Sequence, residues 1–176
     1  MIKGKVVTLQ PATKDNKRTI YNWLIQWKEL APHYCLPSWE EFCNDYKDFF
    51  FDGTQQEVGR CYLVVVNDIP VGQINYHTLY PNYKHTELDI WMKNGNSCGK
   101  GYGSDALRTL CEYLFKELGI KEFIIRPSAQ NQRAINAYQK AGFRRIECNL
   151  KEQISRYSAP DSDDCIVMIK HIEIKE

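Results

Sequence analysis

Hydrophobic residues change their spacing in the middle of the chain, from every second position to a helical repeat. Leu88, Ile90 and Met92 alternate with polar residues, which predicts a strand over residues 86–93. After a glycine-rich turn, the apolar positions of residues 104–118 fall mostly three or four apart: Leu107, Leu110, Cys111, Leu114, Phe115 and Leu118. The sequence therefore predicts a strand, a tight turn and an amphipathic helix over residues 86–118.

The first 50 residues of the chain predict one short strand and two helices. Residues 6–9 form the strand, and Thr13 is placed to cap the first helix. That helix would bury Ile20, Trp23, Leu24 and Trp27. Residues 29–37 contain two prolines and indicate a loop, after which Ser38 and Glu41 form a capping box. The helix that follows would bury Phe42, Tyr46, Phe49 and Phe50.

Further strands complete a single mixed sheet. Residues 60–67 and 69–79 predict a hairpin around Asn67-Asp68, and residues 122–126, 144–151 and 165–172 predict three later strands. A second short helix follows residues 122–126. This order of elements predicts an α/β (α+β) fold in one domain over residues 1–176, with about seven strands and with helices on both faces.

The turn Cys98-Gly99-Lys100-Gly101-Tyr102-Gly103 predicts a phosphate site. Its glycines let the backbone fold tightly, and the N–H groups at the start of a helix are unpaired and attract anions. The spacing fits neither a P-loop, which needs Gly-Lys-Ser/Thr, nor a dinucleotide fingerprint, which needs G-x-G-x-x-G. An ordinary strand-to-helix turn is the alternative for this motif taken alone.

Composition excludes several classes of protein. The chain has 23 basic and 22 acidic residues, so nothing suggests a nucleic-acid surface. No apolar run approaches the ~18 residues of a membrane span, and the N-terminus lacks an apolar signal region. Seven scattered cysteines without a C-x-x-C pair favour a reduced, cytoplasmic setting and predict no metal site.

A second motif lies downstream of the strand at 122–126. Every named position of Asn-x-x-Ala-x-x-x-Tyr-x-Lys-x-Gly-Phe is matched, by Asn131, Ala134, Tyr138, Lys140, Gly142 and Phe143. Together with Gly101 and Gly103 of the turn, this motif resembles the GNAT family of acetyl-CoA-dependent N-acetyltransferases. The turn departs from the family's Gln/Arg-x-x-Gly-x-Gly/Ala only at its first position, where Cys98 stands. The resemblance implies a GNAT fold with a mostly antiparallel sheet, and acetyl-CoA as co-substrate.

Amide formation requires a base, because an ammonium group cannot attack a thioester. A free aliphatic amine has a pKa near ~10.4, so a carboxylate must take its proton, directly or through one water. Glu87 and Asp89 lie two apart on the predicted strand and point to the same face, beside the phosphate turn. We predict Asp89 as the base, and Glu87 as the second choice or an acceptor contact. The alternative is a solvated strand face with two exposed acids.

The resemblance also implies roles around the thioester. Tyr138 would protonate the leaving CoA thiolate, with packing of its helix as the rival role, and Asn131, near Ala134, would bond the pantetheine chain. Backbone N–H groups near Trp91, Met92 and Lys93 would bind the acetyl carbonyl where a bulge splays the sheet. The phosphates would lie on the turn, whose residues are Cys98, Gly99, Lys100, Gly101, Tyr102, Gly103 and Ser104. We reject Cys98 as a nucleophile, since GNAT transfer is usually direct.

The acceptor rests on a narrower resemblance. The segment around Asp89, the turn and the Tyr138 motif look most like aminoglycoside 6′-N-acetyltransferases, which implies the 6′-amino group of an aminoglycoside as acceptor. Tyr34 and Trp39 would contact it. An acidic loop with Asp161, Asp163 and Asp164 would attract a polycation, or is an ordinary polar connection.

Two other functions stay open on the sequence. One is acetylation of a peptide or ribosomal-protein N-terminus, or of a polyamine, since such relatives share the cofactor motifs. The other is a CoA-binding sensor without turnover. We expect a small-molecule amine as partner and a monomer or homodimer, without nucleic acid or membrane.

Overall fold

Eight strands form one sheet in the computed structural model, which describes residues 1–29, 36–78, 85–157 and 164–173. The sheet order is β1-β2-β3-β4-β5-β6-β8-β7. The strands are β1 (Ile2–Lys3), β2 (Thr8–Pro11), β3 (Gly59–Val66), β4 (Ile69–Thr78), β5 (His85–Met92), β6 (Glu122–Ile125), β7 (Arg144–Ile146) and β8 (Val167–His171). β5 and β6 pair in parallel, and the other neighbouring strands pair antiparallel. The mixed, mostly antiparallel α/β fold is therefore confirmed.

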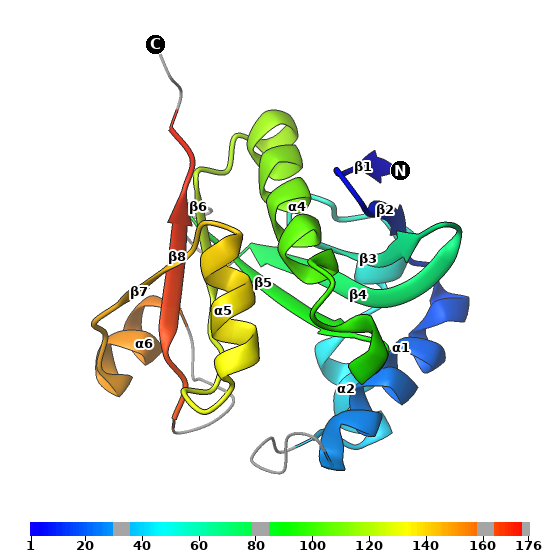
Figure 1. Cartoon of the computed structure of the whole chain (residues 1–176), viewed down its shortest axis with the longest axis horizontal. Helices are drawn as coiled ribbons and strands as arrows, with labels where there is room; N and C mark the ends of the chain where they lie inside the picture. The colour runs from blue at the N-terminus through cyan, green and yellow to red at the C-terminus, as the bar shows by residue number, and fades with distance from the viewer. Residues whose placement is uncertain (30–35, 79–84, 158–163, 174–176) are drawn as a thin grey trace.

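Helices cover both faces of this sheet (Figure 1). They are α1 (Lys17–Ile25), α2 (Trp39–Asp45), α3 (Phe49–Asp52), α4 (Tyr102–Leu118), α5 (Gln132–Lys140) and α6 (Leu150–Arg156), with short 3-10 turns η1 (Lys14–Asn16), η2 (Gln26–Glu29) and η3 (Gly95–Ser97). Alternation along β3 separates the layers: Tyr62 and Val64 join a core with α4 and α5, whereas Cys61, Leu63 and Val65 join one with α1, α2 and α3. The two faces of β5 therefore pack against different helices, with Leu88 in the first core and Trp91 in the second.

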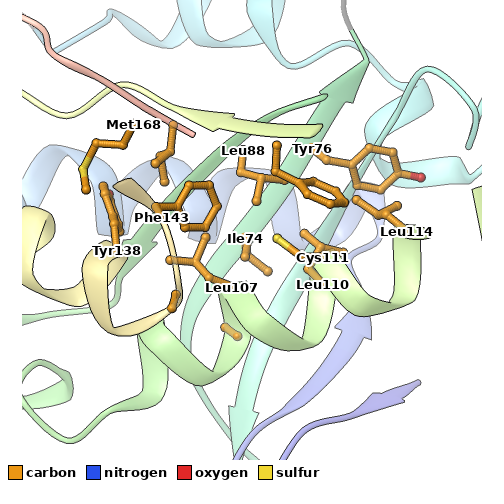
Figure 2. Packing of buried hydrophobic residues seen from close by; sticks show 14 of the residues in the cluster. Ile74, Tyr76, Leu88, Leu107, Leu110, Cys111, Leu114, Tyr138, Phe143 and Met168 are labelled. Carbon is orange, nitrogen blue, oxygen red and sulfur yellow. The ribbon is translucent and has the colours of Figure 1, made fainter. Parts of the chain in front are cut away.

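The core under α4 fixes the helix that follows the glycine turn. Figure 2 shows Leu107, Leu110 and Leu114 of α4 directed at Ile74 and Leu88 of the sheet. The three leucines are fully buried, and each contributes about 1.5–3 kcal/mol in apolar transfer. Since the first residues of α4 belong to the same rigid helix, this packing also positions the turn.

The N-terminal half follows the prediction with shifted boundaries. The strand predicted at 6–9 is β2, and Thr13 precedes η1 rather than a continuous helix. The capping box of Ser38 and Glu41 begins α2 as predicted. The predicted second helix is divided, because α2 ends at Asp45 and α3 begins at Phe49. Most of the predicted loop at 29–37 lies outside the described residues.

The last part of the sheet differs most from the prediction. Residues 144–151 were expected to form one strand, but β7 ends at Ile146 and α6 begins at Leu150. The Asn149 side chain accepts a hydrogen bond from the Glu152 N–H (3.0 Å), and the Asn149 N–H donates to Glu152 Oε2 (3.0 Å). This reciprocal cap stabilises a helix start where the prediction had a strand.

Candidate active site

The sheet opens between β5 and β6. Their parallel pairing stops at Glu87 and Ile124, while β5 continues to Met92. The Lys93 N–H donates to Val71 O (2.8 Å), so odd-numbered residues here turn their N–H groups toward β4. The N–H groups of Ile90 and Met92 consequently point to the opposite side, where β6 has diverged. Figure 1 shows β5 running diagonally away from the last strands.

This opening has a different origin from the predicted one. The β4–β5 register runs without a shift from Thr86 to Met92, so a bulge near Trp91–Lys93 was a wrong expectation. The opening arises because β6 is short. Trp91, Met92 and Lys93 were predicted to bind the acetyl carbonyl through their N–H groups. Of these three, Met92 is the one whose N–H faces the opening, since the Lys93 N–H is bonded to Val71 O. A sheet register of this kind is set by distant strands and cannot be inferred from local sequence.

The glycine turn lies against the end of β5. Gly99 and Gly101 have left-handed φ values of 75° and 82°, and Gly101 is the N-cap of α4. A Cβ placed on Gly103 would lie 3.8 Å from Ile90 Cδ1 and 3.9 Å from Met92 Sδ, which shows how closely the turn approaches the strand. The unpaired N–H groups of the first α4 turn therefore lie at one end of the β5–β6 opening.

Other predicted turn residues have structural bonds. Ser104 Oγ donates to Ala137 O (2.9 Å) and ties α4 to α5, while Cys98 Sγ donates to Asn94 O (3.6 Å). The side chain of Lys100 and the positions of Gly99 and Gly101 are exposed at the helix start. Backbone N–H groups and the Lys100 side chain are thus the groups of this turn that are available to bind an anion.

Glu87 and Asp89 project from the same face of β5, as predicted, but their surroundings differ. Glu87 accepts two hydrogen bonds from Arg126, 2.6 Å from Nε to Oε1 and 3.0 Å from Nη2 to Oε2. The Arg126 side chain is 8% exposed and that of Glu87 21%. Asp89 is exposed, and its Oδ2 accepts a hydrogen bond of 2.7 Å from the Tyr46 hydroxyl. Glu87 is therefore held in an ion pair, and Asp89 accepts a hydrogen bond from a neutral hydroxyl.

The two side chains of α5 and its N-cap that were predicted to act on the cofactor, Tyr138 and Asn131, also stabilise the fold. Tyr138 is 9% exposed and lies in the core under α5, with its ring 6.5 Å from that of Phe143. Figure 2 shows both rings. Asn131 is the N-cap of α5, and its Oδ1 accepts a hydrogen bond from the N–H of Ala134 (3.1 Å). Both residues lie on the same side of the sheet as α4, where the sequence predicts the cofactor.

Of the residues predicted to contact the acceptor, the structure describes only Trp39 and Asp164 outside β5. Trp39 is partly buried, packs on Tyr21 (5.2 Å between centroids) and lies under the guanidinium of Arg18 at 4.4 Å. Asp164 Oδ2 accepts a hydrogen bond from Ser128 Oγ (2.7 Å), which secures the segment after β6. Tyr34, Asp161 and Asp163 lie outside the described residues.

Three residues of this site carried no signal in the sequence: Tyr46 and Arg126, which contact the two acids, and Asn75, whose Nδ2 donates to the Tyr46 hydroxyl oxygen (3.1 Å). Tyr46 appeared only as a core position of a helix, and the sequence separates it from Asp89 by 43 residues. Arg126 was the last residue of a predicted strand, with no pattern linking it to Glu87. No local signal would have found these contacts, since they form only when distant parts of the chain pack against β5.

Other classes of site are not apparent in the described part of the chain. Its histidines, cysteines and acids form no group of three or more that could hold a metal ion. Its helices include none with the length and apolar character needed to cross a bilayer.

Residues 7–144 match the family model of the acetyltransferase (GNAT) domain. The aminoglycoside N(6′)-acetyltransferases type 1 of Klebsiella pneumoniae and Serratia marcescens are each 26% identical over 157 residues, which is 79% of this chain and 74% of each relative. A structure of the aminoglycoside acetyltransferase AAC(6′)-Ib with coenzyme A and kanamycin has a TM-score of 0.71 at 22% identity, over 94% of both chains. RimL, a ribosomal L7/L12 α-N-protein acetyltransferase with coenzyme A, also has 0.71, at 17% identity, over 96% of this chain and 95% of RimL.

Proposed function

We infer the reaction from the family to which this chain belongs, the GNAT acetyltransferases. Its co-substrate is acetyl-CoA, and we propose that the acceptor is a primary amine that attacks the thioester directly. One observation supports this most strongly: an exposed carboxylate, Asp89, lies on the strand whose Ile90 and Met92 N–H groups face the β5–β6 opening.

The proposed mechanism uses the two faces of the sheet. The phosphates would bind the first N–H groups of α4, and the thioester would enter the opening beside Met92. Asp89 would take a proton from the acceptor ammonium, and the neutral amine would form a C–N bond with the acetyl carbon. The N–H groups facing the opening would stabilise the oxyanion. Collapse would break the C–S bond, and the second proton of the attacking nitrogen would pass to solvent. Tyr138 would protonate the thiolate and regain its own proton from solvent.

For the acceptor, we propose the 6′-amino group of an aminoglycoside. Two curated relatives of that activity span 79% of the chain, and Asp89 would attract the ammonium before deprotonating it. The second candidate is a peptide N-terminus or polyamine. Within this second candidate, the Arg126–Glu87 pair favours the peptide N-terminus, which carries a single charge near the reacting amine, because Arg126 neutralises the second carboxylate on this face.

A thiol-release assay with acetyl-CoA separates these candidates. The acceptors would be kanamycin, tobramycin, spermidine and a peptide with an N-terminal Ser or Ala, with the Asp89→Asn variant as control enzyme. An aminoglycoside with a hydroxyl in place of the 6′-amine is the matched control acceptor. Release that requires the 6′-amine supports the first candidate, and release with peptide or spermidine replaces it with the second. No release with any amine, despite acetyl-CoA binding, would contradict both and favour a sensor.

A further inference from the structure

A line of hydrogen bonds crosses the sheet face that α1, α2 and α3 cover, and it ends at Asp89. Cys61 Sγ and Asn75 Nδ2 both donate to Gln73 Oε1 at 3.3 Å, and Asn75 Nδ2 also donates to the Tyr46 hydroxyl oxygen at 3.1 Å. Tyr46 in turn donates to Asp89 Oδ2 at 2.7 Å. Gln73 and Asn75 are 0% and 4% exposed, so Gln73 Oε1 and Asn75 Nδ2 make these bonds in a buried setting, while Gln73 Nε2 has no hydrogen-bond partner among the described residues.

The Tyr46 ring is held on several sides. Its centroid lies 4.5 Å from that of Phe42, 5.6 Å from Phe50 and 5.8 Å from Trp91. The Tyr46 N–H also closes the end of α2 by donating to Phe42 O (2.8 Å). A side chain packed in this way has little rotamer freedom, so its hydroxyl presents a fixed donor to the carboxylate.

We propose that Tyr46 is a positioning residue for Asp89: its hydroxyl holds the carboxylate in one orientation and stabilises the ionised form that accepts the amine's proton. Asn75 supports this by fixing the hydroxyl from its other side. The inference rests on the proposed function, because it takes Asp89 as the base. It adds to that function the residue that caps the end of α2, which the family motifs do not include.

The surroundings of the Tyr46 hydroxyl keep it protonated, as a hydrogen-bond donor must be. Burial, followed by the negative charge of Asp89, raises the pKa of Tyr46 well above its ordinary value. Burial and the same charge raise the pKa of Cys61 on β3. Among the described residues, this face also carries Glu87 with its partner Arg126, and His77 of β4, whose pKa is lowered by burial and by Lys47. Since a raised pKa keeps a tyrosine hydroxyl protonated at neutral pH, Tyr46 keeps its donor proton there.

The test compares Tyr46→Phe with wild type over pH. The variant keeps the ring and loses one hydrogen bond to a charged group, so kcat should fall about tenfold to a hundredfold. Since the ionised form of Asp89 loses stabilisation, the acidic limb of the pH profile of kcat/KM should shift to higher pH by about one unit. The KM for acetyl-CoA should stay unchanged. Tyr76→Phe is the matched control, because its hydroxyl donates to Gln56 O on the opposite face.

Two further measurements keep the outcome decisive. Carbon-13 NMR of the Asp89 carboxyl, with wild type and Tyr46→Phe, reports its titration without turnover, so it separates failure of this inference from failure of the proposed acceptors. If Tyr46→Phe does not fold, Asn75→Ser should shift the same limb in the same direction. An unchanged acid limb and an unchanged Asp89 titration in a folded variant would overturn the proposal and leave Tyr46 a packing residue.

Discussion

Arg126 holds Glu87 through two hydrogen bonds of 2.6 and 3.0 Å, and this pairing distinguishes the two acids of β5. In the sequence, Glu87 and Asp89 are close to equivalent, since both lie on one face of one strand. In the structure, Glu87 is charge-compensated and mostly covered, while Asp89 is exposed beside a tyrosine hydroxyl. The bidentate pair makes Glu87 a poor proton acceptor, because a proton on it would cost the ion pair.

Replacing Glu87 should therefore affect stability more than turnover. In Glu87→Gln the guanidinium of Arg126, 8% exposed, keeps its charge without a carboxylate, which should lower the free energy of unfolding by about 1–3 kcal/mol. Urea denaturation measures this loss, and kcat should stay close to wild type. The double variant Glu87→Gln/Arg126→Gln is the control, since removing both charges should recover part of the stability. A large loss of kcat with intact stability would instead identify Glu87 as the base.

Replacing Asp89 should have the opposite profile. Asp89→Asn removes the proposed base but keeps the side-chain volume, so kcat should fall about 10²- to 10⁴-fold. The dissociation constant for acetyl-CoA, measured by calorimetry, should not change. The residual rate should rise with pH, because the neutral fraction of an amine with a pKa near ~10.4 grows about tenfold per pH unit below that value. Unchanged turnover would exclude Asp89 as the base.

A buried acid at the start of α4 should make stability depend on pH. Asp105 Oδ2 accepts hydrogen bonds from the N–H groups of Val6 (2.7 Å) and Val7 (3.0 Å). Burial alone would raise the pKa of Asp105, but these N–H groups, that of Lys5 and the nearby Arg108 charge lower it below its ordinary value. Because the folded-state pKa is the lower one, its stabilisation is complete above the unfolded value of ~3.9 and is lost as pH falls through the folded value.

Asp105→Asn should accordingly be less stable than wild type by about 1–3 kcal/mol at pH 7, and the difference should shrink as pH falls below ~4. Chemical denaturation at a series of pH values provides the comparison. Asp15→Asn, an exposed position in η1, is the matched control and should show little difference at either pH. If the difference in the free energy of unfolding between Asp105→Asn and wild type is the same at all pH values, the carboxylate charge does not contribute to stability.

The sequence was informative where structure is local. The period change around residues 86–118 predicted β5 and α4, and the Ser38–Glu41 box predicted the start of α2. It was less informative where a competing local signal existed, as at Asn149, whose cap with Glu152 overrides the strand pattern of residues 144–151. The partner of each β5 acid could not be predicted, because Tyr46 and Arg126 reach the strand only through tertiary packing. A side-chain period states which face a residue occupies, but not what lies opposite.

Tyr138 provides the remaining test, because its packing and its proposed acid role can be separated. Tyr138→Phe keeps the ring beside Phe143 in the core under α5 and removes only the hydroxyl. If the hydroxyl protonates the CoA thiolate, kcat should fall about tenfold or more, while the unfolding midpoint and acetyl-CoA affinity stay close to wild type. Tyr113→Phe, a partly buried tyrosine packed against the same core, is the control for losing a hydroxyl. Equal kcat in both variants would assign Tyr138 to packing, and the thiolate, with a thiol pKa near ~8.5, would then leave without a protein acid.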